Sequence, residues 1–153
     1  MTTTRCLRTA ALGLLFVTAR DACGTFFNWQ DEYKPGEGFR GGAVSRLDQA
    51  EHAALRAIDV ATGERRWEFP YTAQSWAGVL STASGLVFAG SSGNFMAFDA
   101  QSGKNLWHYQ TGSALYAGAT TSLLDGRQYV LMPSGTTLTA FALSEAVPEA
   151  GGR

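Results

Sequence analysis

The sequence predicts an all-β fold of β-propeller blades, with about three four-stranded antiparallel blades. Residues 57–67 recur forty residues later at 97–107, with identical alanine, aspartate, glycine and tryptophan. Short runs in which apolar and polar residues alternate, typical of strands, lie between turns. Eighteen of the 153 residues are glycine, which suits a chain that often reverses direction. These three observations favour blades over helical repeats, which need a 3.6-residue pattern.

The repeated segment has the pattern Ala-x-Asp-x-x-Thr/Ser-Gly-x-x-x-Trp. Asp59 and Asp99 are predicted to begin turns, because an aspartate side chain accepts hydrogen bonds from backbone amides just ahead of it. Gly63 and Gly103 are predicted to supply the positive φ that a tight reversal needs. A hairpin therefore recurs every forty residues, and neither aspartate is expected to be catalytic.

A second pair of strands is predicted at 85–89 and 94–98, which gives the four strands of one blade. A third copy begins at 138–141, at a spacing of 43 residues from 95–98. We therefore assign residues 12–143 to a partial propeller domain. Residues 1–11 are set apart as an N-terminal segment, and residues 144–153 are expected to be a disordered tail.

Residues 10–19 allow two interpretations. Arg5 and Arg8 precede an apolar run, as in a signal peptide. However, the sequence of 13–17 closely matches that of 85–89, and a signal peptide has no reason to copy an internal strand. The strand interpretation is therefore favoured.

Two further segments are predicted outside the repeats. Residues 24–42 are rich in glycine and aromatics and contain Pro35. They are interpreted as a long ordered loop whose aromatic side chains pack on the propeller. Residues 48–56 are predicted to form a short helical turn.

Charge and composition argue against several functions. The net charge of −1 gives no basic surface for nucleic acid. No apolar run approaches the roughly 20 residues of a transmembrane helix. The two cysteines and two histidines have no zinc-site spacing. Whether Cys6 and Cys23 pair as a disulfide stays open.

The repeat resembles the tryptophan docking motif of the quinoprotein alcohol dehydrogenases, which depend on pyrroloquinoline quinone (PQQ). Residues 75–88, Ser-Trp-Ala-Gly-Val-Leu-Ser-Thr-Ala-Ser-Gly-Leu-Val-Phe, and 93–99 also look like the C-terminal part of these enzymes. The resemblance covers residues 12 to about 143. It implies an eight-bladed ring exported to the periplasm, which oxidises alcohols or aldose sugars with PQQ and a calcium or lanthanide ion.

The resemblance implies that the family's metal ligands and catalytic aspartate lie in blades nearer the N-terminus, and nothing in this chain matches them. The chain is therefore expected to be a C-terminal fragment or subunit of such a dehydrogenase and inactive alone. Its expected partners are the remaining blades or a second copy of itself, besides the alcohol or sugar substrate of the complete enzyme.

Trp76, with Ala77 and Gly78, matches the family segment whose tryptophan lies near the edge of the quinone. These three are the predicted cofactor-binding residues. An aromatic, Tyr116, stands at the equivalent place of the next repeat, so Trp76 as core filler stays an alternative. Residues 133–138 lack the later tryptophan of the family. Trp67 and Trp107 are predicted to pack between neighbouring blades.

A second hypothesis is a non-catalytic propeller scaffold, similar to the outer-membrane assembly lipoproteins that carry the same repeat. A truncated gene product is a third. Metal and catalytic residues are the feature that only the enzyme needs.

Overall fold

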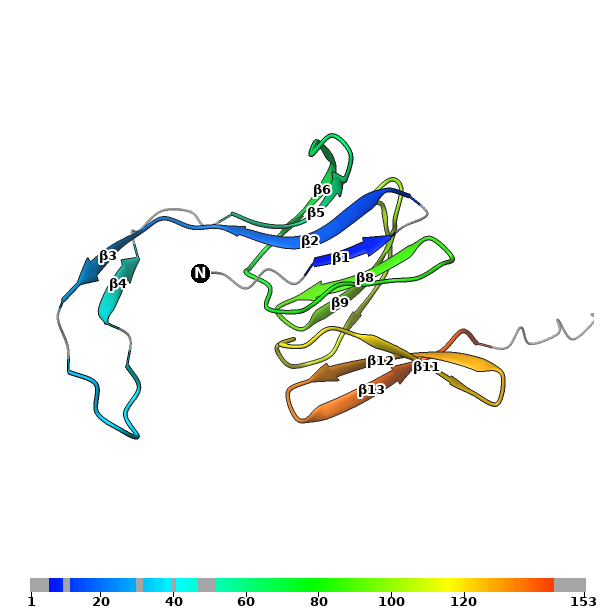
Figure 1. Cartoon of the computed structure of the whole chain (residues 1–153). Coiled ribbons are helices and arrows are strands. Elements are labelled where there is room, and N and C mark those ends of the chain that lie inside the picture. The colour runs from blue at the N-terminus through cyan, green and yellow to red at the C-terminus, as the bar shows by residue number, and fades with distance from the viewer. Residues whose placement is uncertain (1–5, 10–11, 30–31, 40, 47–51, 145–153) are drawn as a thin grey trace, which may run out of the picture.

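The computed structural model describes residues 6–9, 12–29, 32–39, 41–46 and 52–144. Within these residues the chain forms thirteen β-strands and no helix (Figure 1). Eleven strands belong to three antiparallel sheets that stand side by side, and the remaining two form a separate hairpin. The predicted all-β propeller architecture is confirmed, and we call the sheets blades 1 to 3.

Blade 1 has the strand order β1-β2-β5-β6. Its second strand confirms the strand interpretation of residues 14–19, and its first strand begins ahead of residue 12, where the repeat domain was expected to start. The predicted helical turn at 48–56 is wrong for residues 52–56, which are part of a strand, and residues 48–51 lie outside the described residues. The bounds are β1 Cys6–Thr9, β2 Leu14–Asp21, β5 His52–Asp59 and β6 Arg65–Tyr71.

Alternation explains why residues 52–59 form a strand. Ala53, Leu55 and Ala57 are buried on one face of β5, and Arg56 on the other face bonds Glu68 and Asp21. A period of two places successive side chains on opposite faces of a sheet. The weak helical signal of the short alanine-rich run is overridden by this pairing with both neighbours.

Blades 2 and 3 are antiparallel meanders, in which consecutive strands pair. Blade 2 has four strands, whereas blade 3 has three within the described part of the chain. Blade 2 comprises β7 Leu80–Ser81, β8 Leu86–Ser91, β9 Asn94–Asp99 and β10 Asn105–Gln110, and blade 3 comprises β11 Thr120–Leu124, β12 Arg127–Ser134 and β13 Thr137–Phe141. Of the expected tail, only Ser144 is described.

The prediction of a loop at 24–42 is wrong at its two ends, which are strands, and right for the described residues between them. Strands β3 (Gly24–Asn28) and β4 (Gly42–Arg46) pair, with Phe26 opposite Val44. Figure 1 shows this hairpin projecting away from the three blades. Its aromatics are exposed rather than packed on the propeller. Aromatic and β-branched residues favour a pleated backbone, which the glycine-rich composition concealed.

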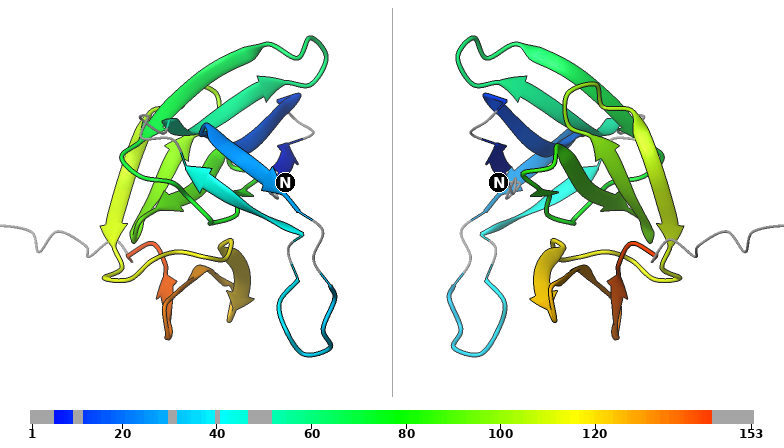
Figure 2. Two further views of the ribbon diagram at one scale, coloured as in Figure 1. Left: turned by 90° about the vertical axis from the view of Figure 1, so that its left-hand side faces the viewer. Right: turned by 90° about the vertical axis from the view of Figure 1, so that its right-hand side faces the viewer.

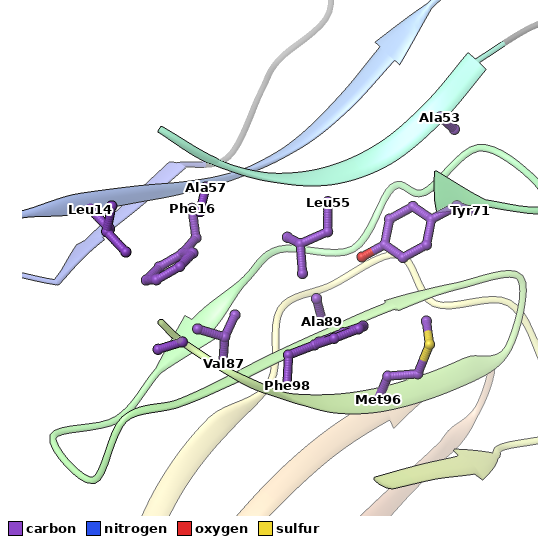
Figure 3. Packing of buried hydrophobic residues seen from close by; sticks show 11 residues of the cluster. Leu14, Phe16, Ala53, Leu55, Ala57, Tyr71, Val87, Ala89, Met96 and Phe98 are labelled. Carbon is purple, nitrogen blue, oxygen red and sulfur yellow. The ribbon is translucent and has the colours of Figure 1, made fainter. Parts of the chain in front are cut away.

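Two apolar clusters join the blades. The larger lies between blades 1 and 2 and includes Phe16, Leu55 and Phe98, which point toward one another (Figure 3). The smaller lies between blades 2 and 3 and includes Phe95 and Met132. Burial of each large side chain contributes roughly 1.5–3 kcal/mol, so the interfaces between blades hold the sheets together.

The repeated aspartates begin turns, as predicted. Asp59 Oδ1 accepts hydrogen bonds from the amides of Ala61 (2.9 Å) and Thr62 (3.1 Å), and Asp99 Oδ1 accepts one from Ser102 (2.7 Å). The amide bonds lower the pKa of Asp59, and a bond from the Ser102 hydroxyl, followed by the bond from the Ser102 amide, lowers the pKa of Asp99. We call the side of the blades that carries these turns the turn face.

The two repeated tryptophans differ in how they pack against the next blade. Trp67 on β6 contacts the turn of blade 2, where its Nε1 donates to the Ala100 carbonyl at 3.0 Å. Trp107 packs on Phe141 of blade 3, with ring centroids 5.2 Å apart, yet 39% of it is exposed. Both tryptophans therefore pack between blades as predicted, and Trp67 is the more covered of the two.

Candidate functional site

The face opposite the turn face carries two connections with the same course. Residues 72–79 run from the outer strand β6 to β7, and residues 111–119 run from β10 to β11. Strands β1 and β7 contact each other, so the first strand of each blade lies on the inner side. We call the face that carries the two connections the crossover face. Figure 2 shows it in its left view, where the projecting β3–β4 hairpin lies in front of part of it.

Buried serines fix both connections to the strands beneath. Ser91 Oγ donates to the Ala73 carbonyl at 2.7 Å, and Ser134 Oγ donates to the Ser113 carbonyl at 2.9 Å. Both serines are almost fully buried. A buried hydroxyl that bonds a carbonyl stabilises the fold by roughly 1 kcal/mol and is costly to leave unpaired. The crossovers therefore have a defined backbone rather than that of loose loops.

Within the first crossover, Ser75 organises the predicted cofactor-binding residues. Its Oγ donates to the Gly90 carbonyl and accepts from the Ala77 amide at 3.2 Å. The Ala77 carbonyl in turn accepts from Thr18 Oγ1 of blade 1 at 3.5 Å. This short segment is thus attached to both neighbouring blades.

The three predicted site residues have different positions. Ala77 and Gly78 are buried beneath the crossover, whereas half of Trp76 (50%) is exposed on its surface. Trp76 belongs to neither of the two apolar clusters of the described residues. An exposed indole on a fixed backbone is a surface to which a flat aromatic ligand can stack.

The second crossover lies directly beside the first. A Cβ added to Gly118 would lie 3.4 Å from the Cα of Gly78. Tyr116 stands two residues before Gly118, as Trp76 stands two residues before Gly78, and 67% of Tyr116 is exposed. The fold thus presents two exposed aromatic residues on adjacent crossovers.

Three buried polar atoms near the crossover end of the blades lack hydrogen-bond partners in the described part of the chain. They are Tyr71 Oη at the end of β6, Gln74 Oε1 in the first crossover and Asn94 Oδ1 at the start of β9. Burial raises the pKa of Tyr71, against a smaller lowering effect of the nearby Thr18 hydroxyl, so its phenol stays protonated and able to donate. Such groups are costly unless a partner pairs with them.

The donor set fits part of a quinone site and does not fit a metal site. The Trp76 indole suits the edge of a flat quinone. Both crossovers, 72–79 and 111–119, contain no lysine or arginine, so pairing of the cofactor's carboxylates needs groups elsewhere. Among the described residues, no three His, Cys, Asp or Glu side chains cluster as metal ligands. Cys23 is exposed and free.

Sequence reasoning missed the buried serines that fix the crossovers. A signal for them exists, because Ser91 and Ser134 are 43 residues apart, the same spacing as the third copy of the repeat. It was overlooked because serines are common in turns and carry little information singly.

The blades and their crossover face define the chain as part of a quinoprotein-type β-propeller. Residues 27–146 match the family model PQQ_2, described as "Outer membrane protein assembly factor BamB". The match covers more than half of the chain, and the chain belongs to this repeat family.

Individual relatives are quinoprotein dehydrogenases. The chain is 38% identical over 121 residues to the quinoprotein ethanol dehydrogenase of Pseudomonas aeruginosa, which is 77% of this chain and 19% of the relative. It is 29% identical over 128 residues to the lanthanide-dependent methanol dehydrogenase of Methylorubrum extorquens, which is 80% of this chain and 21% of the relative. The chain therefore spans about a fifth of the length of these relatives.

A solved structure has the same architecture. A europium-containing methanol dehydrogenase superposes with a TM-score of 0.76 at 30% identity, over 85% of this chain and 24% of that protein. The predicted resemblance to PQQ-dependent dehydrogenases is thus confirmed. Within the described residues, no helix is long and apolar enough to cross a membrane.

Proposed function

We propose that this chain is a segment of a PQQ-dependent dehydrogenase that oxidises alcohols or aldose sugars in the periplasm. Residues 12–143, together with strand β1 ahead of them, form its partial propeller, and Trp76, Ala77 and Gly78 belong to one wall of the cofactor site. One observation carries the proposal. Half of the Trp76 indole is exposed on a crossover that buried hydroxyls fix, in the segment that resembles the enzymes.

In this proposal, the chain's own residues hold and orient the quinone. The bound quinone supplies the oxidising chemistry, as redox cofactors generally do. Trp76 excludes water at the ring edge, and Ala77 and Gly78 keep the backbone beneath it compact. Calcium or a lanthanide would be bound by ligands from other blades. A segment with neither those ligands nor a catalytic base is inactive alone.

The partner that completes this site is the remainder of a propeller, and an open surface on blade 1 supports this. Gly103 in the turn of blade 2 lies against the Trp67 indole, whereas the equivalent Gly63 in blade 1 has no atom near its Cβ position. Val60 is 43% exposed, and the equivalent Ala100 is 1% exposed. The turn of blade 1 thus has an open surface on which an indole from a further blade can pack, as Trp67 packs on Gly103. A second copy of the chain is the other candidate occupant.

A non-catalytic scaffold is the second candidate function. The description of the matched family favours it. A scaffold needs a closed ring of blades and surfaces that bind other proteins, but it needs no quinone.

Quinone binding separates the two proposals. The purified chain is dialysed to equilibrium against PQQ, and bound quinone is measured by absorbance. The dehydrogenase proposal expects saturable binding, and a chain that retains no quinone contradicts it and favours the scaffold.

A turnover assay tests inactivity. The same chain is given an alcohol or glucose, PQQ, calcium or a lanthanide, and an artificial electron acceptor. We expect no cofactor-dependent turnover, and measurable turnover would contradict the proposed dependence on other blades.

A further inference from the structure

Tyr116 is the repeat counterpart of Trp76, and the equivalence extends to the hydrogen bonds around it. Three residues before each aromatic, a carbonyl accepts a bond from a buried serine: Ala73 from Ser91 and Ser113 from Ser134. The second crossover has a further bond, because Thr111 Oγ1 donates to the Gly93 carbonyl at 3.0 Å. The backbone that carries Tyr116 is therefore also attached by hydrogen bonds to the strands beneath it.

The core beneath the crossovers leaves both aromatic rings on the surface. Ala77 and Leu115, neighbours of the two aromatics in sequence, are buried in the same apolar cluster between blades 2 and 3. Leu115 fills the space over Gly90, where an added Cβ would collide with it. Because these neighbours occupy the space below, Trp76 and Tyr116 keep exposed fractions of 50% and 67%.

The two aromatics also belong to adjacent stretches of backbone, since Gly78 and Gly118 approach closely. The two crossovers therefore run side by side at these glycines. With no lysine or arginine in either crossover, a flat ligand is held there by ring contacts and neutral hydrogen bonds.

We propose that the Tyr116 ring is the second aromatic contact of the flat quinone that Trp76 borders. The inference rests on the proposed function and adds a ligand-contacting residue to it. Two aromatic residues on neighbouring blades would fix the orientation of the quinone plane, which one indole at its edge leaves free to rotate. A ring contact requires the aromatic face of residue 116 and not its hydroxyl.

The test compares PQQ binding by the whole chain and its variants, measured by equilibrium dialysis. We expect Tyr116→Ala to raise Kd about tenfold, the change that corresponds to 1.4 kcal/mol. Tyr116→Phe should bind like the parent, because it keeps the ring. Tyr33→Ala is the matched control: Tyr33 is 65% exposed but lies in the connection between β3 and β4, and its loss should leave Kd unchanged.

The outcomes separate this inference from the proposed function. If Trp76→Ala weakens binding while Tyr116→Ala binds like the parent, the inference fails and the proposed function stands. If Tyr116→Phe is as weak as Tyr116→Ala, the ring contact is contradicted. A parent chain that binds no quinone overturns both. Circular dichroism melts of the variants should coincide with the parent, since residue 116 is on the surface.

Discussion

The indole Nε1 of Trp67 donates a 3.0 Å hydrogen bond to the carbonyl oxygen of Ala100. The donor lies on the outer strand of blade 1 and the acceptor on the turn of blade 2. The indole also covers Gly103, where a Cβ would lie 2.5 Å from its Cδ2 atom. One side chain thus satisfies a carbonyl, fills the space over a glycine and extends the apolar cluster between two blades.

Removing this indole should destabilise the chain strongly. We expect Trp67→Ala to lower the free energy of unfolding by about 3 kcal/mol, the lower end for a large aromatic because the ring is partly buried. Trp107→Ala should cost at least about 1 kcal/mol less, since 39% of Trp107 is already exposed. Urea unfolding followed by circular dichroism measures both, and equal losses would contradict the distinction.

Gly103 and Gly63 offer a matched test of the same contact. Both have positive φ, 72° and 76°, so alanine at either position strains the backbone by a similar roughly 1–2 kcal/mol. Only at Gly103 would the new Cβ collide with the Trp67 indole. Overpacking adds roughly 1–3 kcal/mol, so Gly103→Ala should unfold at clearly lower urea concentration than Gly63→Ala. Coinciding midpoints would show that the indole does not rest on this glycine.

Acid should destabilise the chain through its turn aspartates. Hydrogen bonds from the Thr62 and Ala61 amides lower the pKa of Asp59, and bonds from Ser102 lower the pKa of Asp99. Because the folded-state pKa lies below the unfolded value of about 3.9, this stability is present above about pH 4 and is lost as pH falls through the folded pKa. Urea midpoints measured at a series of pH values should therefore decrease below pH 4.

The double variant Asp59→Asn/Asp99→Asn tests this origin, since an amide oxygen still accepts hydrogen bonds but does not titrate. Its midpoint should decrease less steeply below pH 4. Some decrease remains, because the Arg56 guanidinium also lowers the pKa of Glu68. Glu64→Gln, which alters an exposed carboxylate in the first turn, is the control. A double variant with the same pH profile as the parent would contradict the assignment.

The isolated chain should self-associate. The register places Leu124 and Leu138 on the face of blade 3 that points away from blade 2, and both are exposed. Exposed apolar sheet faces and open strand edges promote association. Size-exclusion chromatography should show oligomers at micromolar concentration, and Leu124→Lys/Leu138→Lys should shift the profile toward monomer. A parent chain that elutes as a stable monomer would contradict this expectation.

The repeated part of the fold was predictable from sequence because it appears twice. The forty-residue echo fixed the turns at Asp59 and Asp99 and the strands on either side of them. The β3–β4 hairpin has no second copy in the chain, and its glycines and Pro35 suggested a loop. For strand β5, the sequence suggested a helical turn where the structure has a strand, because pairing with β2 and β6 overrode the helical signal of a short alanine-rich run.

The site was predictable only in part. A resemblance suggested Trp76 as a candidate site residue. The exposure of Trp76 depends on what fills the space below, and that requires the positions of Ala77 and Leu115 from two crossovers. The proximity of Gly78 and Gly118 is likewise a tertiary contact between blades. Sequence spacing gives the equivalence of Trp76 and Tyr116 but not the close approach of Gly78 and Gly118 that follow them.

The central claim is that Trp76 is a ligand-contacting residue, unlike the tryptophan that joins the blades. Trp76→Ala and Trp67→Ala should therefore have opposite profiles. The first should weaken PQQ binding by about 1–3 kcal/mol, the scale of a well-packed aromatic contact, with little change in unfolding. The second should mainly lower the free energy of unfolding.

The most direct measurement is PQQ titration of the parent and Trp76→Ala, with urea unfolding of both proteins in the same buffer. Trp29→Ala, which removes a comparably exposed indole beyond the end of β3, is the control. The account predicts at least about a fivefold rise in Kd for Trp76→Ala alone and superimposable unfolding curves. If Trp76→Ala instead binds quinone like the parent and unfolds as easily as Trp67→Ala, Trp76 is a packing residue and the cofactor site is contradicted.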